Sequence, residues 1–153
     1  MIPAFANTAN YRQAQLDRNK QVIQEFFATT HRGDLEAIDR LVAADIVTHN
    51  FPGGKSPASR GEYKAFFHHW NSGVAEQECV ILAMAAEGEH IAVRYAITGR
   101  HTGELVGVPA TGRTIHFTGV AFYRMERGHI AETWLYPDTA TLLGQLGVLP
   151  AAA

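Results

Sequence analysis

The stretch Tyr123-Arg-Met-Glu-Arg-Gly-His-Ile-Ala-Glu-Thr-Trp134 decides the fold class, because it predicts two β-strands joined by a very short turn. The turn falls at Arg127-Gly128, which is typical of a hairpin. The second strand is expected to run from His129 to Tyr136. A hairpin at this point indicates that neighbouring strands in the second half of the chain are antiparallel.

The residues before this hairpin continue the strand pattern. Three strand-like segments are Glu78–Ala86, His90–Gly99 and Arg113–Glu126. The turn Glu87-Gly88-Glu89 separates the first two of them, and a loop punctuated by glycines and Pro109 covers 101–112. Consecutive hairpins of this kind predict an antiparallel sheet.

The first half of the chain has helical periodicity instead. Apolar residues recur at helical spacing over Tyr11–His31, and Gly33 is expected to end this helix. Asp34 can then cap a second short helix, Leu35–Ala43. A third helix with an aromatic face is expected over about Ser59–Trp70. A last short helix over Ala140–Leu146 follows the final strand.

These elements predict a single domain of 153 residues. Residues 1–10 are expected to form a loose arm, 11–147 the folded domain, and 148–153 a tail. Helices followed by consecutive hairpins indicate the α+β class, with helices packed on one face of a curved antiparallel sheet. Such a sheet can wrap three N-terminal helices into a cone whose open end leaves an apolar pocket.

Composition excludes several classes of partner. Thirteen basic and fifteen acidic residues give a formal charge of −2, and no basic cluster with interleaved aromatics is present, so nucleic-acid binding is not expected. Cys79 is the only cysteine, so no intrachain disulfide can form, which fits a reducing compartment. No signal-peptide pattern and no membrane-spanning apolar run are found. The sequence therefore predicts a soluble, cytoplasmic protein.

Four segments, in this order and spacing, carry a family resemblance. They are Asn19–Phe27 with Gly33–Ala43, then Asp45–Asn50, then Thr98–Gly112, and finally Tyr123–Trp134 with its continuation to Gly147. Together they resemble the SnoaL-like polyketide cyclases, which belong to the ketosteroid-isomerase-like superfamily, also named after nuclear transport factor two. The likeness covers nearly the whole chain, from Asn19 to Gly147.

The resemblance implies a cone-shaped barrel with a hydrophobic pocket, usually a dimer through the sheet, and chemistry without metal or cofactor on an apolar carbonyl compound. In the cyclases, an aspartate after the tryptophan acts as general base beside a carbonyl, and a histidine on the preceding strand assists. These positions correspond here to Leu135 and Ala121. The usual aspartate-based aldol mechanism is therefore not expected.

Three other residues are the candidates for catalysis. His49 corresponds to another histidine of the family's pocket, although it can instead be a structural histidine. Tyr136 can donate a hydrogen bond to a carbonyl or a developing oxyanion. Asp138 is the carboxylate nearest to the missing base, but it can instead cap the helix that begins near Thr139. No His or carboxylate pattern has the spacing of a metal site.

The predicted ligand-binding residues are mostly aromatic. They are Phe51, Phe67, Trp70, Phe117, Ala121, Tyr123, Trp134 and Leu135. An aromatic pocket with few polar groups suits a flat, apolar ligand, although some of these side chains can simply be core. Two functions remain open: a cyclase or isomerase acting on a polyketide-like or steroid-like compound, and a non-catalytic protein that binds hydrophobic ligands.

Overall fold

The computed structural model describes residues 4–149, and they form four helices and a five-stranded sheet. In chain order the elements are α1 (Ala4–Thr30), α2 (Glu36–Leu41), β1 (Val42–His49), α3 (Arg60–Gly73), β2 (Val74–Glu87), β3 (His90–His101), β4 (Thr114–Glu126), β5 (His129–Pro137) and α4 (Thr139–Gln145). The four predicted strands and the hairpin at Arg127-Gly128 are confirmed. Both turn residues have positive φ, 51° and 77°, as a two-residue hairpin turn requires.

The sheet has the strand order β1-β5-β4-β3-β2. Strands β2 to β5 pair antiparallel with their neighbours along the chain, whereas β1 pairs parallel with β5. The sequence predicted only a short apolar segment at Ile46–Phe51 where β1 lies. Val42 and Ile46 of this strand are buried, so its apolar side chains are used to extend the core at one edge of the sheet.

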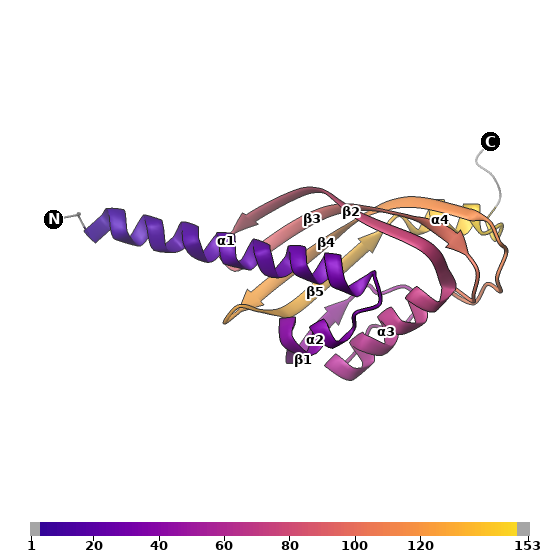
Figure 1. The fold of residues 1–153 in the computed structure, drawn as a ribbon, viewed down its shortest axis with the longest axis horizontal. Coiled ribbons are helices and arrows are strands. Elements are labelled where there is room, and N and C mark those ends of the chain that lie inside the picture. Colours follow the sequence, from indigo (N-terminus) through magenta and orange to yellow (C-terminus); the bar gives the residue numbers. More distant parts are fainter. Residues whose placement is uncertain (1–3, 150–153) are drawn as a thin grey trace.

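Helices α1, α2 and α3 lie on one face of the curved sheet, which bends around them (Figure 1). The core between the two layers includes Ile23 and Phe26 of α1, Ile38 of α2, Tyr63 of α3 and Ile91 of β3. All five side chains are essentially inaccessible to water, which supplies the main hydrophobic stabilisation. The α+β prediction, with a curved sheet around three N-terminal helices, is confirmed.

The prediction of a loose N-terminal arm is wrong for residues 4–10. Helix α1 begins at Ala4, and its first part extends past the edge of the sheet (Figure 1). Residues 7–13 are exposed, so packing does not hold them in the helix. Ala9 and Ala14 have high helix propensity, and the segment continues a helix that the core anchors further along. Residues 1–3 and 150–153 lie outside the described part.

The boundaries of the short helices also differ from prediction. Asp34 does not cap α2: the N-cap position is Leu35, which makes no side-chain cap bond, and the helix stops at Leu41. The backbone N–H of Asp34 instead donates to the Thr29 carbonyl, in a turn that Gly33 permits with φ of 89°. Ser59 does cap α3, accepting from the Glu62 N–H at 3.1 Å.

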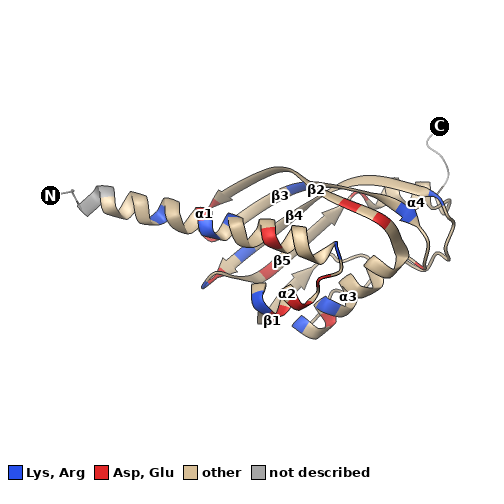
Figure 2. Cartoon of the chain, viewed as in Figure 1, with Lys and Arg blue, Asp and Glu red and all other residues tan. Residues whose placement is uncertain are grey.

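Figure 2 shows Lys and Arg residues interspersed with Asp and Glu over the helices and strands, without an extended block of one sign in this view. Several of these charges form ion pairs on the surface, such as Lys64 with Asp39 at 2.8 Å and Arg40 with Glu25. In the described range, no helix is long and apolar enough to cross a membrane.

Candidate functional site

Strand alternation sorts the residues of β4 and β5 into two faces. Phe117, Ala121 and Tyr123 of β4 are buried toward the helices, and Tyr123 pairs with Thr133 while Ala121 pairs with Leu135 on β5. Because side chains alternate along a strand, their sequence neighbours point to the opposite, outer face. The hairpin thus builds one wall of an interior space with every second residue.

That interior space is a cavity between the sheet and helices α1, α3 and α4. It is lined by Phe26, Phe27, His31, Phe51, Pro52, Tyr63, Phe66, Phe67, Trp70, Tyr95, Ile97, Phe117, Tyr123, Thr133, Leu135, Pro137, Thr139 and Leu142. The volume of this cavity is about 50 Å³. None of these lining residues is Asp, Glu, Lys or Arg. The wall is therefore mostly aromatic, and its titratable groups are the His31 imidazole and the tyrosine hydroxyls.

Six of the eight predicted ligand-binding residues lie on this wall: Phe51, Phe67, Trp70, Phe117, Tyr123 and Leu135. Ala121 is fully buried on the same face of the sheet but does not reach the cavity. The prediction that Trp134 lines the pocket is wrong, because this side chain lies on the outer face of the sheet. Leu135 and Trp134 are consecutive strand residues, so only one of them can point inward.

The outer face of the hairpin holds the first predicted catalytic residue. His49 pairs with Trp134 in the parallel register of β1 and β5, and the two rings stack at 5.0 Å. The Nε2 atom of His49 lies 2.7 Å from Oε2 of Glu132, whose other oxygen accepts from Arg124 at 3.1 Å. The hydrogen bond from His49 and then that from Arg124 hold the pKa of Glu132 below its usual range. His49 is thus part of an outer cluster of polar side chains with Glu132 and Arg124.

The other two predicted catalytic residues also lie outside the cavity. Tyr136 follows Leu135 and is therefore directed outward, with 52% of its surface exposed. Asp138 is the N-cap of α4: its carboxylate accepts from the Thr141 N–H at 3.1 Å and from the Thr141 hydroxyl at 2.7 Å. These bonds lower the pKa of Asp138. The capping interpretation of Asp138 is confirmed.

A histidine that the sequence analysis did not single out does line the cavity. His31 is the residue after the last turn of α1, and its ring lies 5.7 Å from Phe27, stacked, and 5.7 Å from Phe67, edge to face. Its Nδ1 atom is buried and makes no hydrogen bond of ordinary geometry with a described residue. Burial lowers the pKa of His31 to about 4, and the Phe27 carbonyl raises it by less.

The backbone around His31 is held by side chains from other elements. The amide of Asn71 donates to the Thr30 carbonyl at 2.8 Å, and that of Gln77 donates to the His31 carbonyl at 3.2 Å. Gln77 in turn accepts from the indole N–H of Trp70 at 2.6 Å. These bonds tie the end of α1 to α3 and β2, so the imidazole is presented from a fixed backbone.

Hydroxyl groups complete the polar part of the wall. Burial raises the pKa of Tyr63, Tyr95 and Tyr123, so all three phenols remain protonated. Thr133 is almost completely buried; its hydroxyl lowers the pKa of Tyr63 slightly, yet it makes no hydrogen bond of ordinary geometry among the described residues. Cys79 is not on the wall, and burial raises the pKa of its thiol to about 12, which leaves it unreactive.

A sequence model of the SnoaL-like polyketide cyclases matches residues 20–146. The chain belongs to the SnoaL-like polyketide cyclase family. Among proteins with curated descriptions, none matches this sequence significantly.

Solved structures share the fold of this SnoaL-like protein. TsrD from Streptomyces laurentii is 24% identical with a TM-score of 0.80, over 87% of this chain and 97% of TsrD. AclR from Streptomyces galilaeus, described as a candidate hydroxylase, is 25% identical with a TM-score of 0.77, over 88% and 99%. IdmH from Streptomyces antibioticus, described as a candidate polyketide cyclase, is 28% identical with a TM-score of 0.73, over 85% and 99%.

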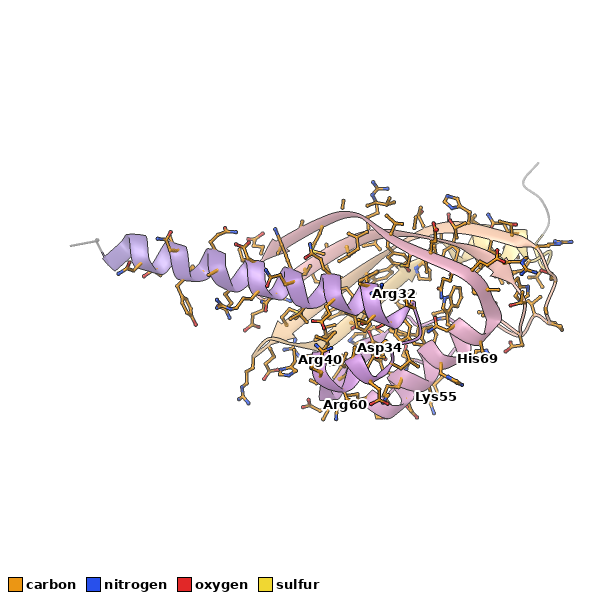
Figure 3. All side chains as sticks on the ribbon, viewed as in Figure 1. Arg32, Asp34, Arg40, Lys55, Arg60 and His69 are labelled. Atoms are coloured by element: carbon orange, nitrogen blue, oxygen red, sulfur yellow. The ribbon has the colours of Figure 1, made fainter. Side chains whose placement is uncertain are left out.

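A second hollow of the SnoaL-like domain lies next to the cavity and shares Pro52, Phe66 and Trp70 with it. This outer hollow is partly open to solvent and measures about 520 Å³. His69 of α3, labelled in Figure 3, pairs across it with Glu104 of the 101–112 loop at 2.7 Å. The half-buried Phe66 ring packs on Phe51 at 4.9 Å and lines both the inner cavity and the outer hollow.

The charged side chains near the helices point elsewhere. Arg40 of α2 and Arg60 of α3 (Figure 3) form ion pairs with Glu25 and Asp39 and do not line the cavity. Within residues 4–149, no group of three or more His, Cys, Asp or Glu side chains is arranged to hold a metal ion. The groups that can meet a ligand in the inner cavity are thus one imidazole, several hydroxyls and aromatic rings, whereas the outer hollow adds His69 and Glu104.

Proposed function

We propose that this protein binds a small, mostly apolar carbonyl compound, polyketide-like or steroid-like, in the inner cavity and promotes its cyclisation or isomerisation. The observation that carries the proposal is the uncharged aromatic wall, shared by the sheet and three helices. Such a wall favours an apolar ring system, and its few polar atoms can orient one or two ligand groups. A charged ligand finds no countercharge there.

The usual aspartate base is not part of this proposal. Leu135, which stands at the position of the family's aspartate, faces the cavity, and the nearest acid, Asp138, is bound to Thr141 outside it. A leucine cannot accept a proton. Catalysis then depends on holding a reactive conformation of the ligand and on hydrogen bonds to its carbonyl oxygen.

The inner cavity alone is too small for a polycyclic compound, so the ligand site includes the outer hollow. Rotation of Phe66 would widen the connection between the two spaces, because its side chain lines both of them together with Pro52 and Trp70. In this arrangement one end of the ligand occupies the inner cavity and the remainder lies in the outer hollow, toward the 101–112 loop.

The competing function is binding without conversion. It is favoured by Leu135 and Ala121, which leave two positions of the family's machinery apolar. Both functions predict saturable binding of apolar ketones, but only the first predicts continued formation of product at substrate excess.

A cavity-filling variant tests the proposed site. The protein is incubated with cyclic enones and with polyketide-like poly-ketones, binding is followed by calorimetry, and products are identified by mass spectrometry. Leu135→Trp is expected to abolish binding by occupying the cavity. Val47→Trp, at an exposed position of β1, is the matched control and should bind as the wild type does. Equal binding by both variants would place the ligand elsewhere, and binding without product would establish the binder.

We also propose that the protein is a homodimer through the outer face of its sheet. Exposed apolar side chains gather on the sheet: Val80, Leu82, Val120, Phe122 and Tyr136. Large apolar side chains that are exposed on one sheet are a feature of interaction sites. Sedimentation velocity of the wild type should give a dimer, and Phe122→Asp should give a monomer. A monomeric wild type would overturn this part of the proposal.

A further inference from the structure

We propose that His31 is the residue that binds the carbonyl oxygen of the ligand, donating a hydrogen bond from Nδ1 of a neutral imidazole. This inference rests on the proposed function, since it assigns a role within the same cavity. It moves the polar contact from the two strands, where the resemblance places catalytic groups, to the end of helix α1. No residue of the outer cluster around His49 takes part.

The first support is an unsatisfied polar atom. Nδ1 of His31 is buried in a wall of rings and has no ordinary hydrogen bond among residues 4–149. Buried polar atoms are nearly always paired, and an unpaired one costs free energy. The Phe27 carbonyl lies close enough to influence the imidazole but not in good bonding geometry. A ligand carbonyl supplies the missing acceptor, and this gain favours ligands that carry one.

The second support is the surroundings of the ring. Phe27 and Phe67 contact the imidazole, and both are uncharged. Burial among these rings removes the hydration that an imidazolium needs and lowers the pKa of His31, so the residue is a neutral donor at physiological pH. With the hydrogen on Nδ1, the other nitrogen is an acceptor. His31 also borders a small surface hollow with Arg32 and Gln77.

The third support is preorganisation. The Asn71 and Gln77 bonds fix the backbone at Thr30 and His31, and the aromatic contacts fix the ring. A donor that is already oriented stabilises charge on a carbonyl oxygen without paying for reorganisation during the reaction. The structure therefore favours a neutral ligand with a ketone or aldehyde oxygen on an otherwise apolar ring system. An isolated carboxylate or phosphate is disfavoured.

A pair of isosteric probes tests this assignment. Acetophenone carries a ketone oxygen, and isopropenylbenzene has the same shape with a CH₂ group in its place. With wild-type protein, the carbonyl stretch of bound acetophenone should move to lower frequency, as hydrogen-bond donation weakens the C=O bond. His31→Phe should lose that shift and bind acetophenone about tenfold more weakly, the scale of one hydrogen bond. Its affinity for isopropenylbenzene should be unchanged.

Two further variants make the result specific. His31→Gln retains an N–H donor and should recover part of the frequency shift. His68→Phe changes an exposed histidine of α3 and should behave as the wild type. If His31→Phe keeps both the shift and the affinity, the role of His31 is wrong while cavity binding stands. If neither probe binds the wild-type protein, or if both bind Leu135→Trp as tightly as the wild type, the proposed function and this inference are both overturned.

Discussion

The inner and outer faces of the β4–β5 hairpin use the same stretch of chain in opposite ways. On the outer face, Glu132 forms an ion pair with Arg124 and a hydrogen bond with His49, and these side chains remain partly accessible to water. On the inner face, Tyr123, Thr133 and Leu135 meet aromatic helix residues, with no Asp, Glu, Lys or Arg on the cavity wall. Residues that are adjacent in sequence thus experience very different electrostatic environments.

This difference explains why the residue types best suited to chemistry lie where they do. A charged pair on the surface keeps most of its hydration and contributes little to the free energy of unfolding. The same pair inside would lose hydration that an aromatic wall cannot replace. The interior therefore holds groups that are polar but neutral, namely phenols, a threonine hydroxyl and the His31 imidazole. The substitutions below test how strictly the two faces differ.

The largest effect is expected for Leu135→Asp. At neutral pH the new carboxylate would be buried without a partner, which should lower the free energy of unfolding by about 3 kcal/mol. Burial raises its pKa above the unfolded value, so the loss should shrink as pH falls toward 5 and the acid becomes neutral. Urea unfolding at the two pH values measures both quantities.

Tyr11→Asp, at an exposed position of α1, is the control. Its side chain is largely exposed and belongs neither to the cavity nor to the proposed dimer surface, so the cost should stay below about 1 kcal/mol and should not shrink at lower pH. Equal losses for the two variants would show that the inner face is hydrated, and the contrast between the faces would then be wrong.

The next effect is the acid sensitivity that His31 confers. Its pKa is about 4 in the folded protein against 6.5 when unperturbed, so the unfolded chain binds the proton first as pH falls. Stability is therefore present above pH 6.5 and is lost as pH falls through this window toward 4. Between pH 7 and 4.5 the loss should be about 2 kcal/mol, from the relation between pKa and free energy.

His31→Phe should remove that part of the pH dependence. The carboxylates with lowered pKa, Asp39, Glu132 and Asp138, lose their own contributions mainly below this window, and they are common to both proteins. The difference between the two unfolding curves therefore isolates His31. Parallel curves from pH 7 to 4.5 would mean that the imidazole is hydrated in the folded state.

The fold was largely predictable because its signals are local. Periodicity and turn residues identify the strands, the hairpin at Arg127-Gly128 and helix α3. The parallel pairing of β1 with β5 was missed, since it joins residues far apart in the chain and β1 is only partly apolar. The helical arm was missed because polar residues such as Asn7 and Asn10 mask the effect of its alanines.

The site was less predictable, for a physical reason. Six aromatic or aliphatic positions on the wall could be chosen from periodicity, but chemical residue type drew attention to His49, Tyr136 and Asp138, which the register places outside. One signal for His31 was present. It lies four residues after Phe27 and continues the apolar stripe of α1, which places it on the buried side of the helix.

A moderate effect is expected where the inner cavity meets the outer hollow. Phe66→Ala removes one of the side chains that line both spaces. It should cost about 1–2 kcal/mol of stability, less than the same substitution at a fully buried phenylalanine. It should also admit longer ketones and accelerate their exchange, measured by the release rate of a bound ligand in stopped flow. Phe66→Leu keeps a smaller partition and should lie between the two. An unchanged release rate would show that ligands enter by another route.

The smallest effect is expected on the outer face itself. Glu132→Gln keeps the shape of the side chain but removes the charge shared by His49 and Arg124, and half-exposed pairs of this kind contribute less than about 1 kcal/mol. The folded-state pKa of Glu132 is lowered, so the wild-type advantage should be present at neutral pH and vanish as pH falls through that value. Added salt should reduce it as well, because partly exposed charges are screened. Ketone binding should not change, since the cluster does not line the cavity. A tenfold loss of binding in Glu132→Gln at unchanged stability would mean that the outer cluster acts on the ligand, and His49 would return as a catalytic candidate in place of His31.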